Sequence, residues 1–573
     1  MKKEQNITTV WEEYQKGVDY NYQQQLYEKS KRNYNFYLGN QWEGAKLSGI
    51  QPITLNIIKS IVKYKVGVVK TNTYQIYFNS EICESQEDRQ KVEDICNMLN
   101  RYANRLWEKN SLNKTVRNCI NDACIDNEGI VYFYADPNPN SNNIFCGQVN
   151  RTNIYYGNEN DDDIQSQPYI IISFRRTVEE VKQEARENGI SEKEIDLIVE
   201  DQDIEEQAGR DKRINELSSM CLVLLKLYKK DGKVWAKKCT KLATVMRDSC
   251  LDIDLYPVAH VLWERVKGSS RGQGEVEWLI PNQIEINKTA TRRALAVKMV
   301  AFPKLVANTK YISNTKALSK VGTTIEVNEF NADDVNKVVN YLKPTAISAD
   351  AYNLQKELQE ETQNLAGASD TATGNVDPTK AAGKAILAVQ QASQQPINEQ
   401  IEAYKDFIED IAKIWFEMLK ANSVNGLVLT REQKDYANNT TLEETYVISY
   451  KELQKYDFDI RIDITPNSPF DKYAIEQSLG NLLTAGHITF EEYVKALPED
   501  SAMPKSKLKD ILKDREEKEN IFNQIEKTAN ALDSAMQQAM TEQEMNNVEQ
   551  TGVNPKELNM INQEKVPVNQ VQK

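Results

Sequence analysis

Residues 366–378 read Ala-Gly-Ala-Ser-Asp-Thr-Ala-Thr-Gly-Asn-Val-Asp-Pro. This stretch separates two segments of the chain that are each expected to be helical. Residues 366–375 are small and polar, with glycine near both ends and no large apolar anchor, which predicts a loop. Asp377 followed by Pro378 is a strong helix-start signal, because aspartate caps free N–H groups and proline suits the first helical turn. We therefore expect an alanine-rich helix over residues 378–420, kinked at Pro396.

Helices are also expected on both sides of this loop. Residues 350–365 have helical composition, and their exposed charges are largely acidic (Glu357, Glu360 and Glu361). Beyond Pro396, apolar residues at three- and four-residue spacing form a seam over almost three heptads. The seam consists of Ile401, Tyr404, Ile408, Ile411, Trp415 and Met418.

Residues 268–349 predict a loop, a helix and an insert. Residues 268–275 are rich in glycine and serine, which predicts a flexible loop. A helix is expected over residues 281–301, since Pro281 suits a first turn, and Phe302-Pro303 should end it. Small residues form a stripe on this helix that permits close approach of another helix: Ala290, Ala294, Val297 and Ala301. Residues 302–349 read as a compact insert with short strands.

The remaining segments mix helical and strand patterns, so we expect a helix-rich mixed α+β fold. Residues 1–280 contain both patterns and a charged, mostly helical insertion at 176–215. Residues 421–468 favour strands, with strict apolar–polar alternation at the end of this range. Residues 469–510 predict short helices, and residues 511–573 predict a charged, glutamine-rich helical stretch that gives way to a disordered end.

Composition restricts the class of protein. A chain of 573 residues is too long for one core, so several sub-domains are expected. The net charge of −14 argues against a dedicated DNA binder with a basic face, but it is compatible with a channel through which DNA slides. We expect no signal peptide and no membrane span, because no apolar run reaches about 18 residues.

Catalytic and metal-binding patterns are not found, so we predict no enzyme activity, no cofactor and no metal site. Of the two histidines, His260 is expected to be a satisfied core or edge residue and His487 a helix cap. Gly383-Lys384 superficially matches a phosphate-binding loop, but Ala385 stands where serine or threonine is required. The 8 cysteines lack metal-ligand spacing and are expected to be buried free thiols. Residues 161–163, three aspartates, lack the spacing of a calcium loop.

Four stretches, in this order and over this length, carry a resemblance to a known family. They are 37–42 (YLGNQW), 56–62 (NIIKSIV), 274–283 (GEVEWLIPNQ) and 377–395. The chain resembles, from about residue 20 to about residue 500, the portal proteins of tailed bacteriophages, which form the head-to-tail connector ring.

The resemblance implies a division of the chain into named parts. A wing would comprise residues 1–280 and 421–468, and a stem would comprise helices 281–301 and 350–365 on either side of a clip at 302–349. Residues 366–377 would be the tunnel loop, followed by the long kinked helix at 378–420, a helical crown at 469–510 and the tail at 511–573.

The resemblance also implies a function, a set of partners and a location. It predicts a ring of about twelve subunits at one capsid vertex. This ring would be the channel for DNA packaging and ejection, and the docking site for the packaging motor and the tail connectors. Its partners would be double-stranded DNA, the major capsid and scaffolding proteins, the terminase large subunit and a head–tail adaptor. It would be found in the virion, and in the host cytoplasm during assembly. The small-residue stripe and the 401–418 seam are candidate contacts between subunits.

Two groups of residues are candidates for facing DNA. In the loop, small hydroxyl and amide side chains would touch phosphates without the strong binding that lysine clusters give: Ser369, Thr371, Thr373 and Asn375, with Lys380 and Lys384 behind them. A plain surface loop is the alternative. In the stem, Lys288, Arg292 and Arg293 would face the channel, or would instead pair with the acidic second stem helix of a neighbouring subunit.

Two other functions remain open at this point. A DNA-packaging enzyme, such as a terminase-like nuclease or ATPase, needs a phosphate loop or an acidic metal cluster, and the sequence offers neither. A monomeric minor virion or adaptor protein would differ from a ring subunit in its mass in solution.

Overall fold

The computed structural model describes residues 2–45, 51–70, 72–79, 86–136, 143–201, 219–302, 304–320, 322, 324–328, 338–342, 349–368, 395–423, 426–435, 440–448, 459–466, 469–497, 507–508 and 511–512. The chain divides into two compact units, Met1–Pro466 and Asn467–Lys573.

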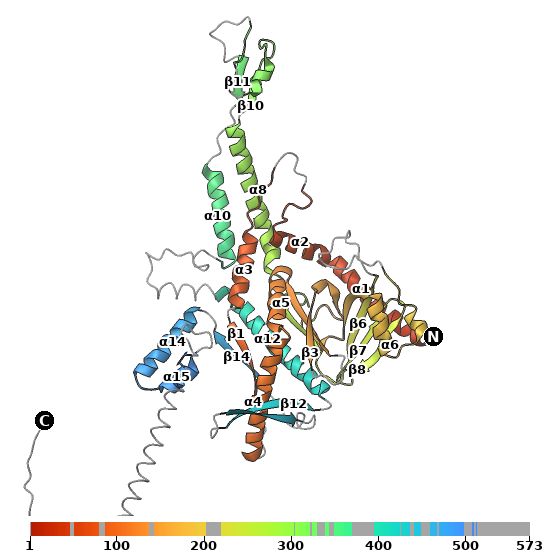
Figure 1. Cartoon of the computed structure of the whole chain (residues 1–573). Coiled ribbons are helices and arrows are strands. Elements are labelled where there is room, and N and C mark those ends of the chain that lie inside the picture. Colours follow the sequence, from red (N-terminus) through yellow and green to blue (C-terminus); the bar gives the residue numbers. More distant parts are fainter. Residues whose placement is uncertain are drawn as a thin grey trace, which may run out of the picture. The chain divides into compact units, whose positions relative to one another are not determined.

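Long helices dominate the first unit (Figure 1). Its described α-helices are, in chain order, α1 (Lys2–Gln23), α2 (Leu26–Leu38), α3 (Ile57–Val69), α4 (Gln86–Lys109), α5 (Leu112–Asp126), α6 (Val178–Glu187), the short α7 (Glu192–Ile195), α8 (Glu275–Ala301), α10 (Ala349–Leu365) and α12 (Asn398–Asn422). The helix expected over residues 350–365 is found with nearly the same bounds as α10. Gly39 closes α2 in a left-handed conformation (φ 101°), and its N–H donates to the carbonyl of Asn35.

The strands of the first unit pair antiparallel throughout its described residues. They are β1 (Asn72–Asn79), β2 (Glu128–Ala135), β3 (Ile144–Val149), β4 (Ile154–Tyr156), β5 (Tyr169–Thr177), β6 (Met220–Lys230), β7 (Lys233–Cys239), β8 (Thr244–Cys250), β9 (Val258–Leu262), β10 (Lys304–Ala307), β11 (Val339–Leu342), β12 (Leu427–Asp435), β13 (Thr440–Ile448) and β14 (Asp459–Pro466). Their orders are β4-β5-β6-β7-β8, β3-β2-β9, β1-β14, β10-β11 and β12-β13. The expected mixture of helices and sheets is confirmed.

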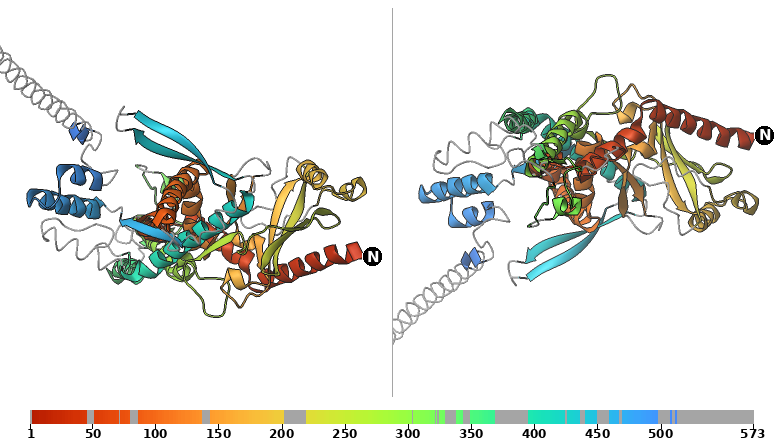
Figure 2. Two further views of the ribbon diagram at one scale, coloured as in Figure 1. Left: turned by 90° about the horizontal axis from the view of Figure 1, so that it is seen from below. Right: turned by 90° about the horizontal axis from the view of Figure 1, so that it is seen from above.

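The five-stranded sheet is covered on both faces, which explains why β5 carries consecutive apolar residues. Ile170 and Ile172 join the main core, whereas Ile171 packs on the opposite face with Tyr14 and Val18 of α1. In Figure 2 this first helix, marked N at its end, runs beside the strands. Helices α6 and α7 of the charged insertion bury a small cluster of their own against the same sheet. Residues 202–218 of that insertion lie outside the described part.

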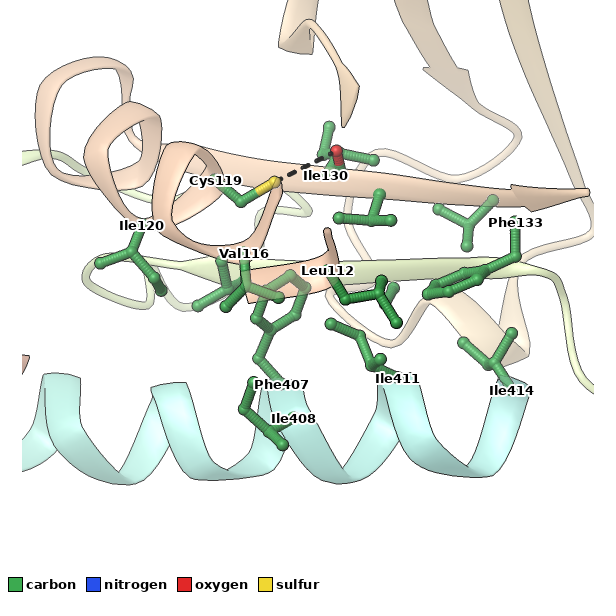
Figure 3. Packing of buried hydrophobic residues seen from close by; sticks show 14 of the residues in the cluster. Leu112, Val116, Cys119, Ile120, Ile130, Phe133, Phe407, Ile408, Ile411 and Ile414 are labelled. Atoms are coloured by element: carbon green, nitrogen blue, oxygen red, sulfur yellow. Dashed lines mark hydrogen bonds between the residues drawn. The ribbon is translucent and has the colours of Figure 1, made fainter. Parts of the chain in front are cut away.

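The apolar side of helix α12 lies in the core of the first unit (Figure 3). Phe407, Ile411 and Ile414 pack against α5, β2 and β9, and each is at most 2% exposed. The 401–418 seam was a candidate contact between subunits, and for the seam this expectation is wrong. Its apolar side chains are buried inside the chain, because α12 packs across the β3-β2-β9 sheet.

Two helix starts differ from the sequence prediction. Helix α8 begins at Glu275 and not at Pro281, so the proline lies inside the helix. Helix α12 begins at Asn398, directly after a 3₁₀ turn at Gln395–Ile397 that contains Pro396. Residues 378–394, where the first half of the kinked helix was expected, lie outside the described residues.

The second unit contains α14 (Pro469–Thr484) and α15 (Phe490–Ala496), within the range 469–510 where short helices are predicted. Thr489 and Glu492 form a reciprocal capping box at the start of α15. The backbone of His487 closes the end of α14 by donating to the carbonyl of Leu482, with Gly486 left-handed at φ 76°. The expected cap at His487 is thus confirmed. None of the helices described in either unit is long and apolar enough to span a membrane.

Candidate functional site

The start of α8 is fixed to the first unit by buried polar contacts. The N–H of Gly274 donates to Oδ1 of Asn127 at 2.9 Å. The carboxylate of Glu275 is fully buried, and it accepts from Nζ of Lys65 at 2.6 Å and from Nε1 of Trp263 at 3.3 Å. These contacts hold the first turns of α8 in place and so offset the cost of a proline inside the helix, which is about 3 kcal/mol.

The loop before α8 is tightly packed, so the prediction of a flexible loop at 268–275 is wrong. Ser270 and Arg271 are 2% and 5% exposed. A Cβ atom on Gly272 would lie 2.8 Å from the backbone oxygen of Glu264, so glycine is required there for close backbone approach. The glycines of this loop mainly provide room for packing and not freedom of movement.

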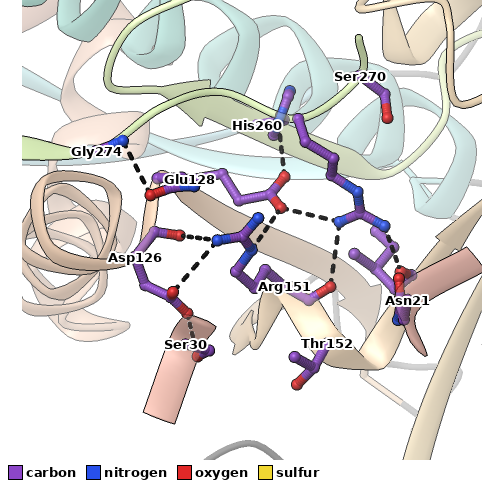
Figure 4. A network of polar contacts seen from close by, with 12 residues as sticks. Asn21, Ser30, Asp126, Glu128, Arg151, Thr152, His260, Ser270 and Gly274 are labelled. Atoms are coloured by element: carbon purple, nitrogen blue, oxygen red, sulfur yellow. Dashed lines mark hydrogen bonds and ion pairs between the residues drawn. The ribbon is translucent and has the colours of Figure 1, made fainter. Parts of the chain in front are cut away.

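Arg271 is the centre of a buried charge network, which comprises Asp126, Glu128, Arg151, Glu159, His260 and Arg271. Figure 4 labels four of its members, Asp126, Glu128, Arg151 and His260. Nη1 of Arg271 donates to Oε1 of Glu128 at 2.9 Å and to the carbonyl of Arg151 at 3.1 Å. Its Nη2 donates to the carbonyl of Ile154 at 2.9 Å and to Oε1 of Glu159 at 3.1 Å. One guanidinium therefore joins the α8 loop to β2, β4 and the loop that follows β4.

Glu128, at the start of β2, lies between two guanidinium groups and a histidine ring. Besides Arg271, it contacts Nε of Arg151 at 3.3 Å and Nε2 of His260 at 3.1 Å. Burial opposes ionisation of the carboxyl, but these three partners outweigh burial and lower its pKa to about 2. His260 is thus a satisfied histidine at a sheet, as the sequence indicated.

Asp126 has the opposite electrostatic balance, although it also accepts hydrogen bonds. It accepts from Oγ of Ser30 and, at 3.3 Å, from Nη1 of Arg151. Burial dominates over these contacts and raises the pKa of its carboxyl to about 6. A pocket of about 190 Å³ lies beside this group, lined by Ser30, Tyr34, Asp122, Asp126, Glu128, Val149, Asn150 and Arg151.

A second set of buried contacts, the polar ladder, runs along α8 and comprises Gln283, Asn287 and Thr291. Oε1 of Gln283 accepts from the N–H of Ile57 at 3.0 Å, and Oδ1 of Asn287 accepts from the N–H of Leu55 at 2.9 Å. One turn further, Oγ1 of Thr291 accepts from the N–H of Ile53 at 3.0 Å. The extended segment before α3 is therefore bound along α8 much as a strand is bound in a sheet.

Helix α10 packs against α8 and contacts Arg293, one of the three stem cations proposed from the sequence. Nη1 of Arg293 donates to Oε1 of Gln355 at 2.8 Å, and its guanidinium lies 4.9 Å from the ring centre of Tyr352. Asn282 adds a hydrogen bond to Thr362 at 3.3 Å nearer the start of α8. Arg293 is thus engaged within its own chain.

The sequence profile of the phage P22-like portal proteins matches residues 12–559 of the chain. The chain belongs to this family. None of the curated proteins matches the chain.

In this portal-family chain the structure describes some of the predicted DNA-facing residues and not others. Lys288 is half exposed and pairs with Glu285 on its own helix at 2.7 Å, and Arg292 is exposed. Ser369, Thr371, Thr373, Asn375, Lys380 and Lys384 lie outside the described residues, so the predicted tunnel loop remains a prediction.

The far half of α8 exposes apolar side chains, unlike its base. Val297, Val300 and Phe302 are 58%, 47% and 76% exposed. On α10, Tyr352 and Leu354 are exposed to a similar extent. The strands β10 and β11 that follow also expose Val306, Tyr341 and Leu342. Of the small-residue stripe, Ala290 is buried within the chain, whereas Val297 and Ala301 remain on the surface.

The described residues offer no metal centre: no group of three or more His, Cys, Asp or Glu among them is arranged to hold an ion. Cys119, Cys124 and Cys239 are buried free thiols, and burial raises the pKa of each. Residues 161–163 form local turns in which Asp161 and Asp163 accept from nearby N–H and O–H groups.

Proposed function

We propose that this portal-family chain is a ring subunit at one vertex of a phage capsid, and that the ring is the channel for DNA packaging and ejection. The ring would contain about twelve copies. It would dock the packaging motor during assembly and the tail connectors afterwards. Its partners would include the major capsid and scaffolding proteins, the terminase large subunit and a head–tail adaptor.

The observation that carries this proposal is the contrast between the two halves of α8. The base is tied down by the buried charge network and the polar ladder, whereas the far half exposes Val297, Val300 and Phe302. A monomer in water gains nothing from such exposure, but neighbouring subunits could bury it. The base then provides a rigid support from which α8 and α10 project.

The division of the chain follows the same proposal. The stem would be α8 and α10, the clip would be residues 302–349 with β10 and β11, and the tunnel loop would be residues 366–377. The wing would take residues up to α8 and the strands at 421–468, and α14 and α15 would belong to the crown. Within the stem, Lys288 and Arg292 would face the channel, whereas the contact of Arg293 with α10 favours a packing role.

The loop proposal is tested by deletion of residues 369–374. We expect intact rings that package or retain DNA poorly, because small polar side chains would no longer line the path. Loss of ring assembly in this variant would instead show that the loop is structural.

The proposal as a whole is tested by the mass of the purified protein. A ring should have a mass near twelve times 65.7 kDa and a closed shape in electron micrographs. A stable monomer at high concentration would contradict the ring and favour a minor virion or adaptor protein. ATP turnover by the purified chain would contradict a purely structural role.

A further inference from the structure

A row of exposed cations lies where α4 meets α5, in a chain whose net charge is −14. Between residues 101 and 117 the charged residues are Arg101, Arg105, Lys109, Lys114 and Arg117, against the single acid Glu108, and all six are exposed. We call these five cations the basic ridge. Its positive charge is opposite in sign to that of the protein as a whole.

The geometry of α4 aligns three of these cations. Arg101, Arg105 and Lys109 follow at intervals of four residues, so they lie along one side of the helix, about 6 Å apart per step. Lys114 and Arg117 follow on α5, directly after the left-handed turn at Ser111 (φ 51°). Exposed asparagines stand next to two of these cations: Asn104 precedes Arg105 and Asn118 follows Arg117.

The ridge is held rigidly by the side chains beneath it. Leu106 and Leu112 are buried in the main core, Tyr102 contacts Trp415 of α12, and Nε1 of Trp107 donates to Oδ1 of Asn113 at 2.6 Å. The aromatic residues of this region are therefore engaged inside the chain. The exposed groups are cations and amides.

Four cations of the ridge are not neutralised as other surface cations of the chain are. Across the parts of the chain that the structure describes, Arg105, Lys109, Lys114 and Arg117 have no carboxylate within ion-pair distance, whereas Lys238, Lys233 and Lys413 do. At one end Arg117 lies near Lys70, and burial together with this like charge lowers the pKa of Lys70 to about 8. An anion bound between them would relieve this repulsion.

We infer that the basic ridge binds the phosphate backbone of duplex DNA without regard to sequence, at a site separate from the proposed channel. Rows of Arg, Lys and Asn are the groups that contact phosphates. The choice of DNA among polyanions rests on the proposed function. An acidic protein partner is less well supported, because protein interfaces use exposed aromatic anchors, and the aromatics here face inward.

A closed circular duplex is the appropriate probe, because it cannot thread through a closed ring. Binding of relaxed circular DNA to the purified full-length protein is measured by filter binding from about 0.05 to about 0.3 M salt, the range in which phosphate contacts weaken measurably. The test variant is R105Q/K109Q/K114Q. Its control, K193Q/K267Q/K413Q, removes the same charge from exposed sites elsewhere.

We expect the test variant to bind circular DNA at least about tenfold more weakly at about 0.1 M salt, with the control close to the unmodified protein. The slope of log K against log salt should also become shallower by about 2.7, since each lost phosphate contact removes about 0.9. Equal weakening in both variants would show that only the net charge matters, and it would overturn the inference. Unchanged binding in the test variant would overturn it as well. Loss of ring mass in the test variant alone would overturn it too and make the ridge a subunit interface. If the protein never forms rings but the test variant still loses DNA binding, the proposed function is contradicted and the inference about the basic ridge holds.

Discussion

Nη1 of Arg271 lies 2.9 Å from Oε1 of Glu128, and the two side chains are 5% and 0% exposed. Their residues are 143 positions apart in the sequence, and the contact fixes the loop that starts α8 to the first residue of β2. The same guanidinium satisfies Glu159. Arg271 is therefore one of the residues that fix the proposed stem to the body of the first unit, together with Glu275 and the polar ladder.

Replacing Arg271 with alanine should strongly destabilise the first unit. The change leaves Glu128 and Glu159 buried with fewer cations, and breaking a buried pair in this way costs about 3–5 kcal/mol. Urea denaturation followed by circular dichroism measures the loss. Arg265→Ala is the matched control, because Arg265 pairs with Asp162 at an exposed site and should contribute less than about 1 kcal/mol. Equal effects of the two substitutions would show that the network does not stabilise the fold.

Replacing Gln283 with leucine should release the segment before α3 from α8. The substitution keeps the approximate volume but leaves the N–H of Ile58 without its partner. It also removes one of two partners from the N–H of Ile57 and from the carbonyl of Leu55, which still bond to each other. Unsatisfied buried groups cost about 1–3 kcal/mol each. Hydrogen exchange should therefore become much faster at residues 53–58 than in the rest of the chain. Asn364→Leu, at an exposed position of α10, is the control and should leave exchange in this segment unchanged.

Replacing Asp126 with asparagine should change how stability depends on pH. Burial raises the pKa of this carboxyl from 3.8 to about 6 in the folded chain, so the folded state favours the protonated form. The contribution of Asp126 is therefore fully present below pH 3.8 and is lost as pH rises through about 6. The variant cannot ionise, so its melting temperature relative to the unmodified protein should rise between about pH 4 and about pH 6 and then stay level. The variant can gain at most about 3 kcal/mol of stability relative to the unmodified protein over this range. Each unit of the pKa difference between 3.8 and about 6 corresponds to about 1.4 kcal/mol.

A pH-independent difference between these two proteins would show that Asp126 does not titrate in this range. Glu128 does not confuse the comparison. Its pKa is lowered from 4.5 to about 2, so its contribution to stability is lost as pH falls below 4.5, and both proteins contain it.

Local patterns in the sequence predicted the features of the fold that depend on neighbours along the chain. The helix expected at 350–365 is found as Ala349–Leu365. The spacing of Ile408, Ile411 and Trp415 correctly indicated one apolar side of a helix. The sequence could not show what this side would pack against, because a core and a subunit interface require the same pattern.

The residues that fix α8 were missed because their partners lie far away in the sequence. The glycine and serine residues around Arg271 suggest a flexible loop, but the partners that hold Arg271 lie 112–143 residues earlier in the chain. Pro281 suggested a helix start, but contacts of Glu275 with Lys65, 210 residues away, hold an earlier turn in place. One signal was available for the polar ladder: Gln283, Asn287 and Thr291 recur every four residues on one side of a helix whose other buried positions are mainly apolar.

Replacing Val300 with glutamate should prevent ring assembly without unfolding the chain. Val300 is 47% exposed in the single subunit, so a charge there remains in water and should change the stability of the subunit by less than about 0.5 kcal/mol. In the proposed ring the same position is covered by a neighbour, and an unpaired carboxylate buried there would cost several kcal/mol at every contact around the ring. Sedimentation should then find folded monomers or small oligomers in place of a ring, with unchanged circular dichroism. Lys298→Gln, in the same exposed turn, is the control and should still assemble. Rings of full mass from Val300→Glu would show that this side of α8 faces solvent in the assembly, and the contact between subunits would have to be sought elsewhere.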